Sequence, residues 1–426
     1  MKRILTAFIA ILFMASPAHA ETIRLLMETV PDTRYIEELL PEFEKQTGIK
    51  VELEVISYND MHAKLVPQLL SSKGTYDGIV VDFYWVGEFI KAGWLMPLDK
   101  LVKRDGFDTS VYVPKLTDLV GKVDGVQYML PFYNYSMAVI YRKDLIEDPK
   151  EKAAFKSKYG IDLKVPKAWD EYWKQVEFFT RDTDNDGKKD LFGTVIQGQR
   201  GDCISMQWAN FLYGQGGRFH DKNWNPTINS DAGVKAMKAY REAVVNFSPP
   251  GSESFCFDEA ANVMAQGKAY SLQTFNIMFA GFDDPSSSQV VGKVAITSNP
   301  GGGLNGGWGW AIPNSSPNKE AVWKFYKWVE SYDIAKRRAL LGGAPTQTKI
   351  FTDPEVVSKR PYYPILGEIL AGSQDFPVFT YTTELVEKMG LEFNLAATGD
   401  KDPKAALDAA NTAYRKLLIK DGKISN

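Results

Sequence analysis

Residues 22–82 alternate between strand and helix patterns, in the order strand, helix, strand, helix, strand. Apolar side chains occupy every second position in the first two strand patterns, at residues 23–27 and 51–55. The third pattern, at residues 78–81, is apolar throughout, which is typical of a strand buried on both faces of a parallel sheet. This order predicts an α/β domain built on a mainly parallel sheet with right-handed crossovers.

Polar and aromatic residues stand at the ends of these predicted strands. The carboxyl ends of parallel strands lie along one edge of a sheet, and ligands bind in the crevice outside that edge. Aromatic walls with few fixed polar groups are typical of such pockets, so residues 82–85 are predicted to contact a ligand. The alternative is that the loops are polar as most loops are, and that Trp85 only covers the core. The residues at the three ends are Glu28, Thr29, Ser57, Tyr58, Asp82, Phe83, Tyr84 and Trp85.

Strand and helix patterns continue through the rest of the chain and become mainly helical after Pro345. Asp32 and Thr33 are expected to cap the first helix. Pro166 is expected in the first turn of a helix that ends at Phe179, where a missing N–H has no cost. Residues 193–197 are predicted to form a strand. The pattern therefore predicts a second α/β segment.

The first twenty residues have the pattern of a secretory signal peptide. Lys2 and Arg3 precede an apolar run at residues 4–14, and Ala18-His19-Ala20 matches a signal-peptidase site. The run is shorter than the about 20 residues that span a bilayer. We expect residues 1–20 to be removed, leaving a periplasmic or extracellular protein that begins at Glu21. A retained amphipathic anchor is the alternative.

The composition excludes several classes of function. The chain has 53 acidic and 50 basic residues, which disfavours nucleic acid or anionic membrane as its main partner. Of its three His residues one lies in the expected signal peptide, which leaves little for a catalytic triad or a His-ligated zinc. The 10 Trp and 20 Tyr supply many rings that can stack on a ligand.

Five segments, spread over most of the chain, share a pattern with one known family. They are residues 43–51 (FEKQTGIKV), 141–145 (YRKDL), 165–171 (VPKAWDE), 264–269 (MAQGKA) and 307–313 (GWGWAIP), the last followed by SPNKEA at 316–321. In these segments the chain resembles the extracellular solute-binding proteins of sugar-importing ABC transporters, the family that includes maltose-binding protein. The resemblance implies a monomeric, non-enzymatic protein that delivers a solute to a membrane permease.

The resemblance also implies an α/β fold of two lobes, with mixed and parallel sheets flanked by helices and a helical C-terminal region. Three hinge crossovers are expected, near residues 131–134, 306–311 and 342–346. Lobe 1 would comprise residues 21–131 and 311–343, and lobe 2 residues 135–306 and 347–426. Crossovers that contain Gly or Pro beside a strand suit segments that absorb backbone rotation.

The family's ligand contacts can be carried over residue by residue. The site departs from that of maltose-binding protein, because Asn276 stands where a stacking aromatic is expected and a carboxylate is missing around Tyr135. A ligand smaller or more polar than a long maltodextrin is therefore expected: a small carbohydrate, a polyol or an acidic sugar derivative. The implied contacts are Glu28, Thr29, Tyr58, Asp82, Tyr84, Trp85, Asn134, Tyr135, Gln199, Arg200, Asn276, Gly307, Trp308 and Tyr381.

Two further features concern stability. Cys203 and Cys256 are the only cysteines, and in an exported protein an even count favours a disulfide over two separate thiols. Asp182, Asp184, Asp186 and Asp190 have the spacing of a calcium loop, although Gly193 stands where such loops carry a Glu. A structural Ca²⁺ is one interpretation and an Asp-rich turn capped by its own side chains is the other. No cofactor is required.

The side chains point to capture of a ligand by hinge closure. Aromatic faces cover C–H groups of a sugar, while Asp, Asn, Gln and Arg pair with its hydroxyls, and Arg200 offers a bidentate contact to an anionic ligand. Arg200 as a solvated loop residue is the alternative. Two other functions stay open: an exported glycosidase or polysaccharide lyase that uses carboxylates such as Glu28 and Asp82, and a binding subunit for a membrane sensor.

Overall fold

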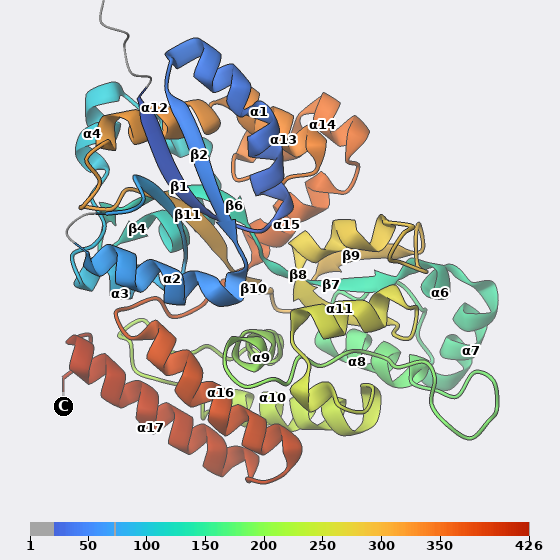
Figure 1. The fold of residues 1–426 in the computed structure, drawn as a ribbon. Helices are drawn as coiled ribbons and strands as arrows, with labels where there is room; N and C mark the ends of the chain where they lie inside the picture. Colours follow the sequence, from blue (N-terminus) through green and yellow to red (C-terminus); the bar gives the residue numbers. More distant parts are fainter. Residues whose placement is uncertain (1–20, 72–73, 426) are drawn as a thin grey trace, which may run out of the picture.

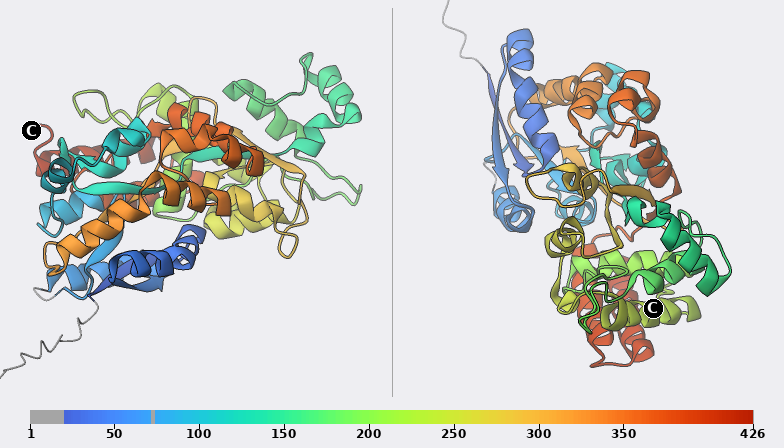
Figure 2. Two further views of the ribbon diagram at one scale, coloured as in Figure 1. Left: turned by 90° about the horizontal axis from the view of Figure 1, so that it is seen from above. Right: turned by 90° about the vertical axis from the view of Figure 1, so that its right-hand side faces the viewer.

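The protein is described by a computed structural model that places residues 21–71 and 74–425. It has two halves (Figure 1), one around a five-stranded sheet and the other around a three-stranded sheet. The C-terminal helices α16 (Thr382–Thr398) and α17 (Pro403–Asp421) lie at the lower end of the second half in both Figure 1 and the right-hand view of Figure 2. This arrangement agrees with the predicted two-lobe α/β class.

The sheet of the first half has the strand order β2-β1-β3-β11-β6. β1 pairs in parallel with β2 and β3, as the strand and helix order predicts, while β11 runs antiparallel to β3 and β6. β11 returns from late in the sequence, so the sheet is mixed. The strands are β1 (Thr22–Glu28), β2 (Lys50–Ile56), β3 (Gly78–Asp82), β6 (Met129–Asn134) and β11 (Gly307–Ala311), with a separate hairpin of β4 (Lys122–Val123) and β5 (Val126–Gln127).

Helices surround this sheet, and their apolar sides supply the core, in which Trp310, Trp323 and Tyr326 are buried. The helices of this half are α1 (Pro31–Thr47), α2 (Tyr58–Leu70), α3 (Val86–Lys91), α4 (Asp99–Asp105), α5 (Pro114–Leu116), α12 (Lys319–Val329), α13 (Tyr332–Leu341) and α14 (Pro354–Lys359). Helix α15 (Tyr363–Gly372) contacts both this half and the sheet of the second half.

The start of α1 differs from the expected cap. The helix begins at Pro31, and Asp32 and Thr33 lie inside its first turn. Thr33 donates its hydroxyl hydrogen to the Glu28 carbonyl at 2.7 Å, and Asp32 faces Arg338 and the Ala344 N–H. Both side chains therefore serve tertiary contacts, which local helix-start signals do not reveal.

The second half is built on an antiparallel sheet of order β8-β7-β9. Its strands are β7 (Met137–Arg142), β8 (Ser271–Phe275) and β9 (Val294–Ser298). Its helices, besides α16 and α17, are α6 (Lys143–Glu147), α7 (Pro149–Tyr159), α8 (Trp169–Phe179), α9 (Asp202–Gly214), α10 (Asp231–Glu242) and α11 (Phe257–Ala265).

Two local predictions in this half are wrong. Residues 193–197 form no strand, because their backbone binds loops and a side chain instead: the Thr194 N–H donates to the Phe247 carbonyl and the Gln197 N–H to Gln207 Oε1. Helix α8 begins at Trp169, so Pro166 lies in the preceding loop.

The chain passes between the halves at three places. β6 leads into β7, and the pair β10 (Leu304–Asn305) and β12 (Gln374–Asp375) lies next to the start of β11. After Gly343 the turn η6 (Thr348–Thr352) and α14 pack on α13, and α15 then contacts both η6 and β9 of the second half. The lobe boundaries derived from the sequence stay a prediction.

Cys203 and Cys256 are joined in a disulfide, with their Cα atoms 5.3 Å apart. In residues 21–71 and 74–425, none of the helices combines the length and the apolar character needed to cross a membrane. The expected signal peptide, residues 1–20, lies outside the described residues.

Candidate ligand-binding site

The candidate site begins where two parallel strands end. β1 ends at Glu28 and β3 at Asp82, and these residues are buried, with 8% and 2% of their surface exposed. The register of the two strands places Leu26 beside Ile79, so both end at the same edge of the sheet. The edge predicted to meet a ligand therefore carries two buried carboxylates.

Two tyrosines hold these carboxylates. Tyr133 Oη donates a hydrogen bond to Glu28 Oε2, and Tyr135 Oη donates one to Asp82 Oδ1. Tyr133 lies near the end of β6 and Tyr135 just beyond it, so the exit of one strand supplies both donors. Hydrogen bonds to an ionised carboxylate are strong, and a ligand hydroxyl offers the same kind of donor as a phenol.

Burial controls the acidity of both groups. It raises the pKa of Glu28 from 4.5 to about 7, and the hydrogen bond from Tyr133 offsets part of this effect. Burial also raises the pKa of Asp82 well above its ordinary value; the bond from Tyr135 opposes the shift, and the charges of Glu28 and Asp202 add to it. Both carboxyl groups therefore keep a proton to a higher pH than they would in water.

Aromatic rings stand beside the carboxylates. Tyr58 stacks on Trp85 with 5.9 Å between ring centroids, and Trp85 meets Trp308 edge to face at 5.3 Å. Trp308 pairs with Asp82 across the β3–β11 register and stacks on Tyr133 at 6.1 Å. The site thus combines flat apolar faces with hydrogen-bond acceptors, which suits a ligand with both C–H groups and hydroxyls.

A hydrogen bond between Tyr58 and Asp202 joins the two halves at this site. Tyr58, at the start of α2, donates from Oη to Oδ2 of Asp202 at 2.9 Å, and Asp202 is the first residue of α9. Tyr58 Oη also lies 2.6 Å from Tyr84 Oη. Asp202 was absent from the predicted contacts, because an acid at the start of a helix has an ordinary role there. Asp202 lies two residues after the predicted contact Arg200, and this position is the feature of the sequence that could have indicated a contact.

Two buried amides link the strand exits. Asn134 donates from Nδ2 to the Pro345 carbonyl, and its Oδ1 accepts a bond from Asn276 Nδ2 at 3.1 Å. Asn276 is 4% exposed, and its Oδ1 has no hydrogen-bond partner among the described residues. These two predicted residues therefore lie side by side.

Other predicted contacts lie apart from this group. Thr29, Gln199 and Arg200 are exposed, and Arg200 Nε donates to Asn394 Oδ1 at 3.3 Å. Tyr381 precedes α16, with the Lys420 ammonium 3.9 Å from its ring centroid. Gly307 is buried next to Tyr133, and an added Cβ would lie 2.9 Å from the Tyr133 carbonyl oxygen. Arg200 therefore stands apart from the buried carboxylates.

The acidic loop holds itself together. Asp182 accepts hydrogen bonds from the N–H groups of Asn185 and Gly187, both at 2.7 Å. Carboxylate oxygens of Asp182, Asp184 and Asp190 lie within 4.8 Å of one another, and Asp186 is not part of this group. The calcium site stays a prediction, and three carboxylates rather than four lie close enough together to bind one ion.

Comparison with known proteins agrees with this architecture. Residues 28–336 match the family described as bacterial extracellular solute-binding protein. A probable amino-acid ABC transporter periplasmic-binding protein of Sinorhizobium fredii is 28% identical over 86% of this chain and 82% of its own length. A mannitol-binding protein of Pseudomonas aeruginosa is 25% identical over 95% of this chain and 94% of its own.

A solved structure is similar over most of the chain. The solute-binding protein of an ABC transporter from Agrobacterium radiobacter, in complex with ribitol, has a TM-score of 0.80 and 27% identity over 94% of this chain and 100% of that one. The predicted two-lobe fold and the resemblance drawn from the five segments are thereby confirmed. This protein belongs to the bacterial extracellular solute-binding protein family.

Proposed function

We propose that this protein captures a small neutral polyol or sugar between its two halves and delivers it to the membrane permease of an ABC importer. The observation that carries the proposal is a set of three carboxylates, each accepting a hydrogen bond from a tyrosine hydroxyl beside aromatic rings. The pairs are Glu28–Tyr133, Asp82–Tyr135 and Asp202–Tyr58. The mannitol and ribitol named for two similar proteins support a polyol.

The carboxylates explain the choice of ligand. They accept hydrogen bonds and offer none while ionised, so they suit a ligand that presents several hydroxyl donors. A ligand without one of these hydroxyls leaves an acceptor oxygen of a carboxylate without a donor from the ligand, which costs about 1–3 kcal/mol. Neutral ligands are favoured over acidic sugars, because each of these carboxylates repels a negatively charged ligand when it is ionised.

Closure is the proposed mechanism. Glu28 and Asp82 belong to the first half and Asp202 to the second, so a ligand between them contacts both halves only when these are together. A ligand shifts an equilibrium between open and closed forms by its difference in affinity for the two. We place the crossovers near residues 131–134, 306–311 and 342–346, each of which contains Gly or Pro.

No bond of the ligand is made or broken in this proposal. Membership of a family of binding proteins supports it, as does the use of each carboxylate as an acceptor for a neighbouring tyrosine. Incubation with oligosaccharides and polyols, followed by mass spectrometry, should return each compound intact. A cleaved or dehydrated product would instead support a glycosidase or lyase.

A ligand panel tests the proposed binding. We expect D-mannitol or ribitol to raise the melting temperature and to give saturable heats in calorimetry, with maltose and D-gluconate weaker. L-Glutamate belongs in the panel, because one similar protein is named for amino-acid transport. Binding of glutamate or gluconate alone would overturn the assignment to neutral hydroxyl compounds.

Export and transport are tested in cells. We propose that residues 1–20 direct export, that the mature protein is monomeric, and that it serves uptake rather than sensing. Deletion of the gene should abolish uptake of the labelled ligand and leave ligand-induced gene expression intact. Loss of induction with normal uptake would instead indicate a binding subunit for a sensor.

A further inference from the structure

The bond between Tyr58 and Asp202 depends on how the first turn of α9 is held. Asp202 follows Gly201, whose φ of 97° is a conformation that side-chain-bearing residues rarely adopt, so the chain turns sharply into the helix here. The Asp202 carboxylate uses Oδ1 to accept the Cys203 N–H at 2.9 Å and Oδ2 to accept Tyr58 Oη. A small shift of this turn would separate Asp202 from Tyr58.

The segment before α9 is tied to the loop that precedes α11. The Gly198 N–H donates to the Ser252 carbonyl and the Gln199 N–H to the Phe255 carbonyl, both at 3.0 Å. Asn394 Nδ2 bridges the two segments by donating to the carbonyls of Gly198 and Glu253. These hydrogen bonds hold the segment up to Gln199 and stop short of Asp202.

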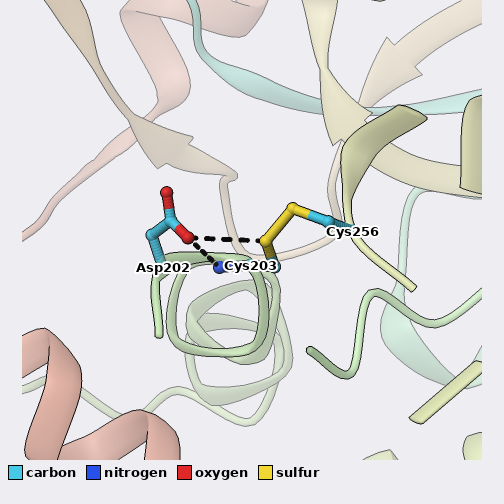
Figure 3. Close-up of side chains that lie close together, drawn as sticks. All are labelled: Asp202, Cys203 and Cys256. Carbon is cyan, nitrogen blue, oxygen red and sulfur yellow. Dashed lines mark hydrogen bonds between the residues drawn. A yellow bond between two sulfur atoms is a disulfide. The ribbon is translucent and has the colours of Figure 1, made fainter. Parts of the chain in front are cut away.

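The disulfide adds a covalent link beside Asp202 to the hydrogen bonds that Ile204 and Ser205 make at the start of α9. Cys203 is the next residue in the chain, and it is bonded to Cys256, the residue before α11. Figure 3 shows the carboxylate of Asp202 beside this bridge, at the start of α9. Cys203 is 2% exposed, so the bridge is buried where it meets α9, and it links the first turn of α9 to the start of α11.

We propose that the Cys203–Cys256 disulfide is a positioning element that fixes the start of α9, so that Asp202 meets Tyr58 when the two halves close. The inference rests on the proposed function for its effect on ligand binding. The bridge spans 53 residues of sequence, so it also restricts the unfolded chain. Its effect on affinity is separate from that effect on stability, because it acts through one named carboxylate.

A double-mutant cycle separates the two effects. The variants are D202A, C203A/C256A and their combination in the mature chain, with D-mannitol and ribitol as calorimetric probes. D202A should weaken binding about tenfold in the disulfide-bonded protein, and less than about threefold in the C203A/C256A background. Equal losses in both backgrounds would show that the bridge does not act through Asp202, and would overturn the proposal. D231A is the matched control, since Asp231 is the exposed first residue of α10, and it should not change affinity.

Hydrogen exchange of the ligand-free protein gives a readout that needs no ligand. C203A/C256A should speed exchange in peptides covering residues 198–206 and 55–62, and leave β1 and α13 unchanged. Unchanged exchange at 198–206 would overturn the proposal even if a polyol binds. Failure of both probes to bind the wild type would count against the proposed function alone. If C203A/C256A does not fold, C203V/C256A, which fills more of the buried space at Cys203, takes its place.

Discussion

Arg338 and Glu330 form an ion pair inside the protein, with 3.0 Å between Nη1 and Oε1 and side chains 5% and 0% exposed. Arg338 Nη2 also donates to the Phe132 carbonyl at 2.8 Å and lies 3.4 Å from Asp32 Oδ1. Trp310 Nε1 donates to Glu330 Oε1 at 2.9 Å. One guanidinium thus joins α13 to α1 and to β6, and Glu330 extends the network to Trp310 of β11.

Loss of Arg338 should strongly destabilise the protein. R338M leaves Glu330 and Asp32 buried without a cation, which is expected to lower the free energy of unfolding by about 3–5 kcal/mol. Urea unfolding measures the change. R337A is the matched control on the same helix, because its pair with Glu42 is 37% and 39% exposed and should contribute about 0–1 kcal/mol. Adding E330Q to R338M should recover part of the loss, whereas no recovery would contradict the buried-charge explanation.

Stability should fall as the pH rises through the range set by Glu28. Its pKa is raised from 4.5 to about 7 by burial, so between these values the folded protein binds more protons than the unfolded chain. The free energy of unfolding therefore decreases as the pH rises. The stabilisation from Glu28 is complete below about pH 4.5 and is lost by about pH 7, which lowers the free energy of unfolding by up to about 3 kcal/mol. E28Q should flatten this part of the profile, measured by denaturant unfolding at pH 5 and pH 8. An identical slope in E28Q would show that other groups cause it.

Asp82 should determine ligand affinity. D82N keeps the size of the side chain and replaces one acceptor oxygen by an NH₂ group, which cannot accept a hydrogen bond from a ligand hydroxyl, so affinity for the bound polyol is expected to fall about 10–100-fold. Calorimetry measures the change. T29A and R200A should have no effect, since Thr29 and Arg200 are exposed and stand apart from the buried carboxylates. If R200A lowers affinity as much as D82N does, the result would support a contact between Arg200 and an anionic ligand.

Calcium should act through three carboxylates. If the loop binds the ion, calcium raises the melting temperature and a chelator lowers it, and D182N abolishes the response. D186N should keep it, because Asp186 lies outside the group formed by Asp182, Asp184 and Asp190. If neither calcium nor a chelator changes the melting temperature, the loop is a turn capped by its own side chains and not a calcium site.

Much of the site could be predicted because strand ends are readable from sequence. The apolar run of β3 stops at Asp82 and the alternation of β1 stops near Glu28, and parallel pairing then brings these two residues to one edge. Asp202 could not be found in this way, since its carboxylate meets Tyr58 across 144 residues of sequence. Thr29 follows Glu28 directly yet is exposed. Successive side chains of an extended chain point in opposite directions, so the residue next to a buried one can face the solvent.

The sequence by itself determined the order of strands and helices, the family and the kinds of side chain at the strand ends, because these follow from local periodicity and short motifs. Only the tertiary structure decided which tyrosine meets which carboxylate, that Arg338 joins α13 to α1 and β6, and that residues 193–197 form no strand. These outcomes depend on hydrogen bonds and burial among segments far apart in the chain, and no local pattern records which distant partner a buried group will find.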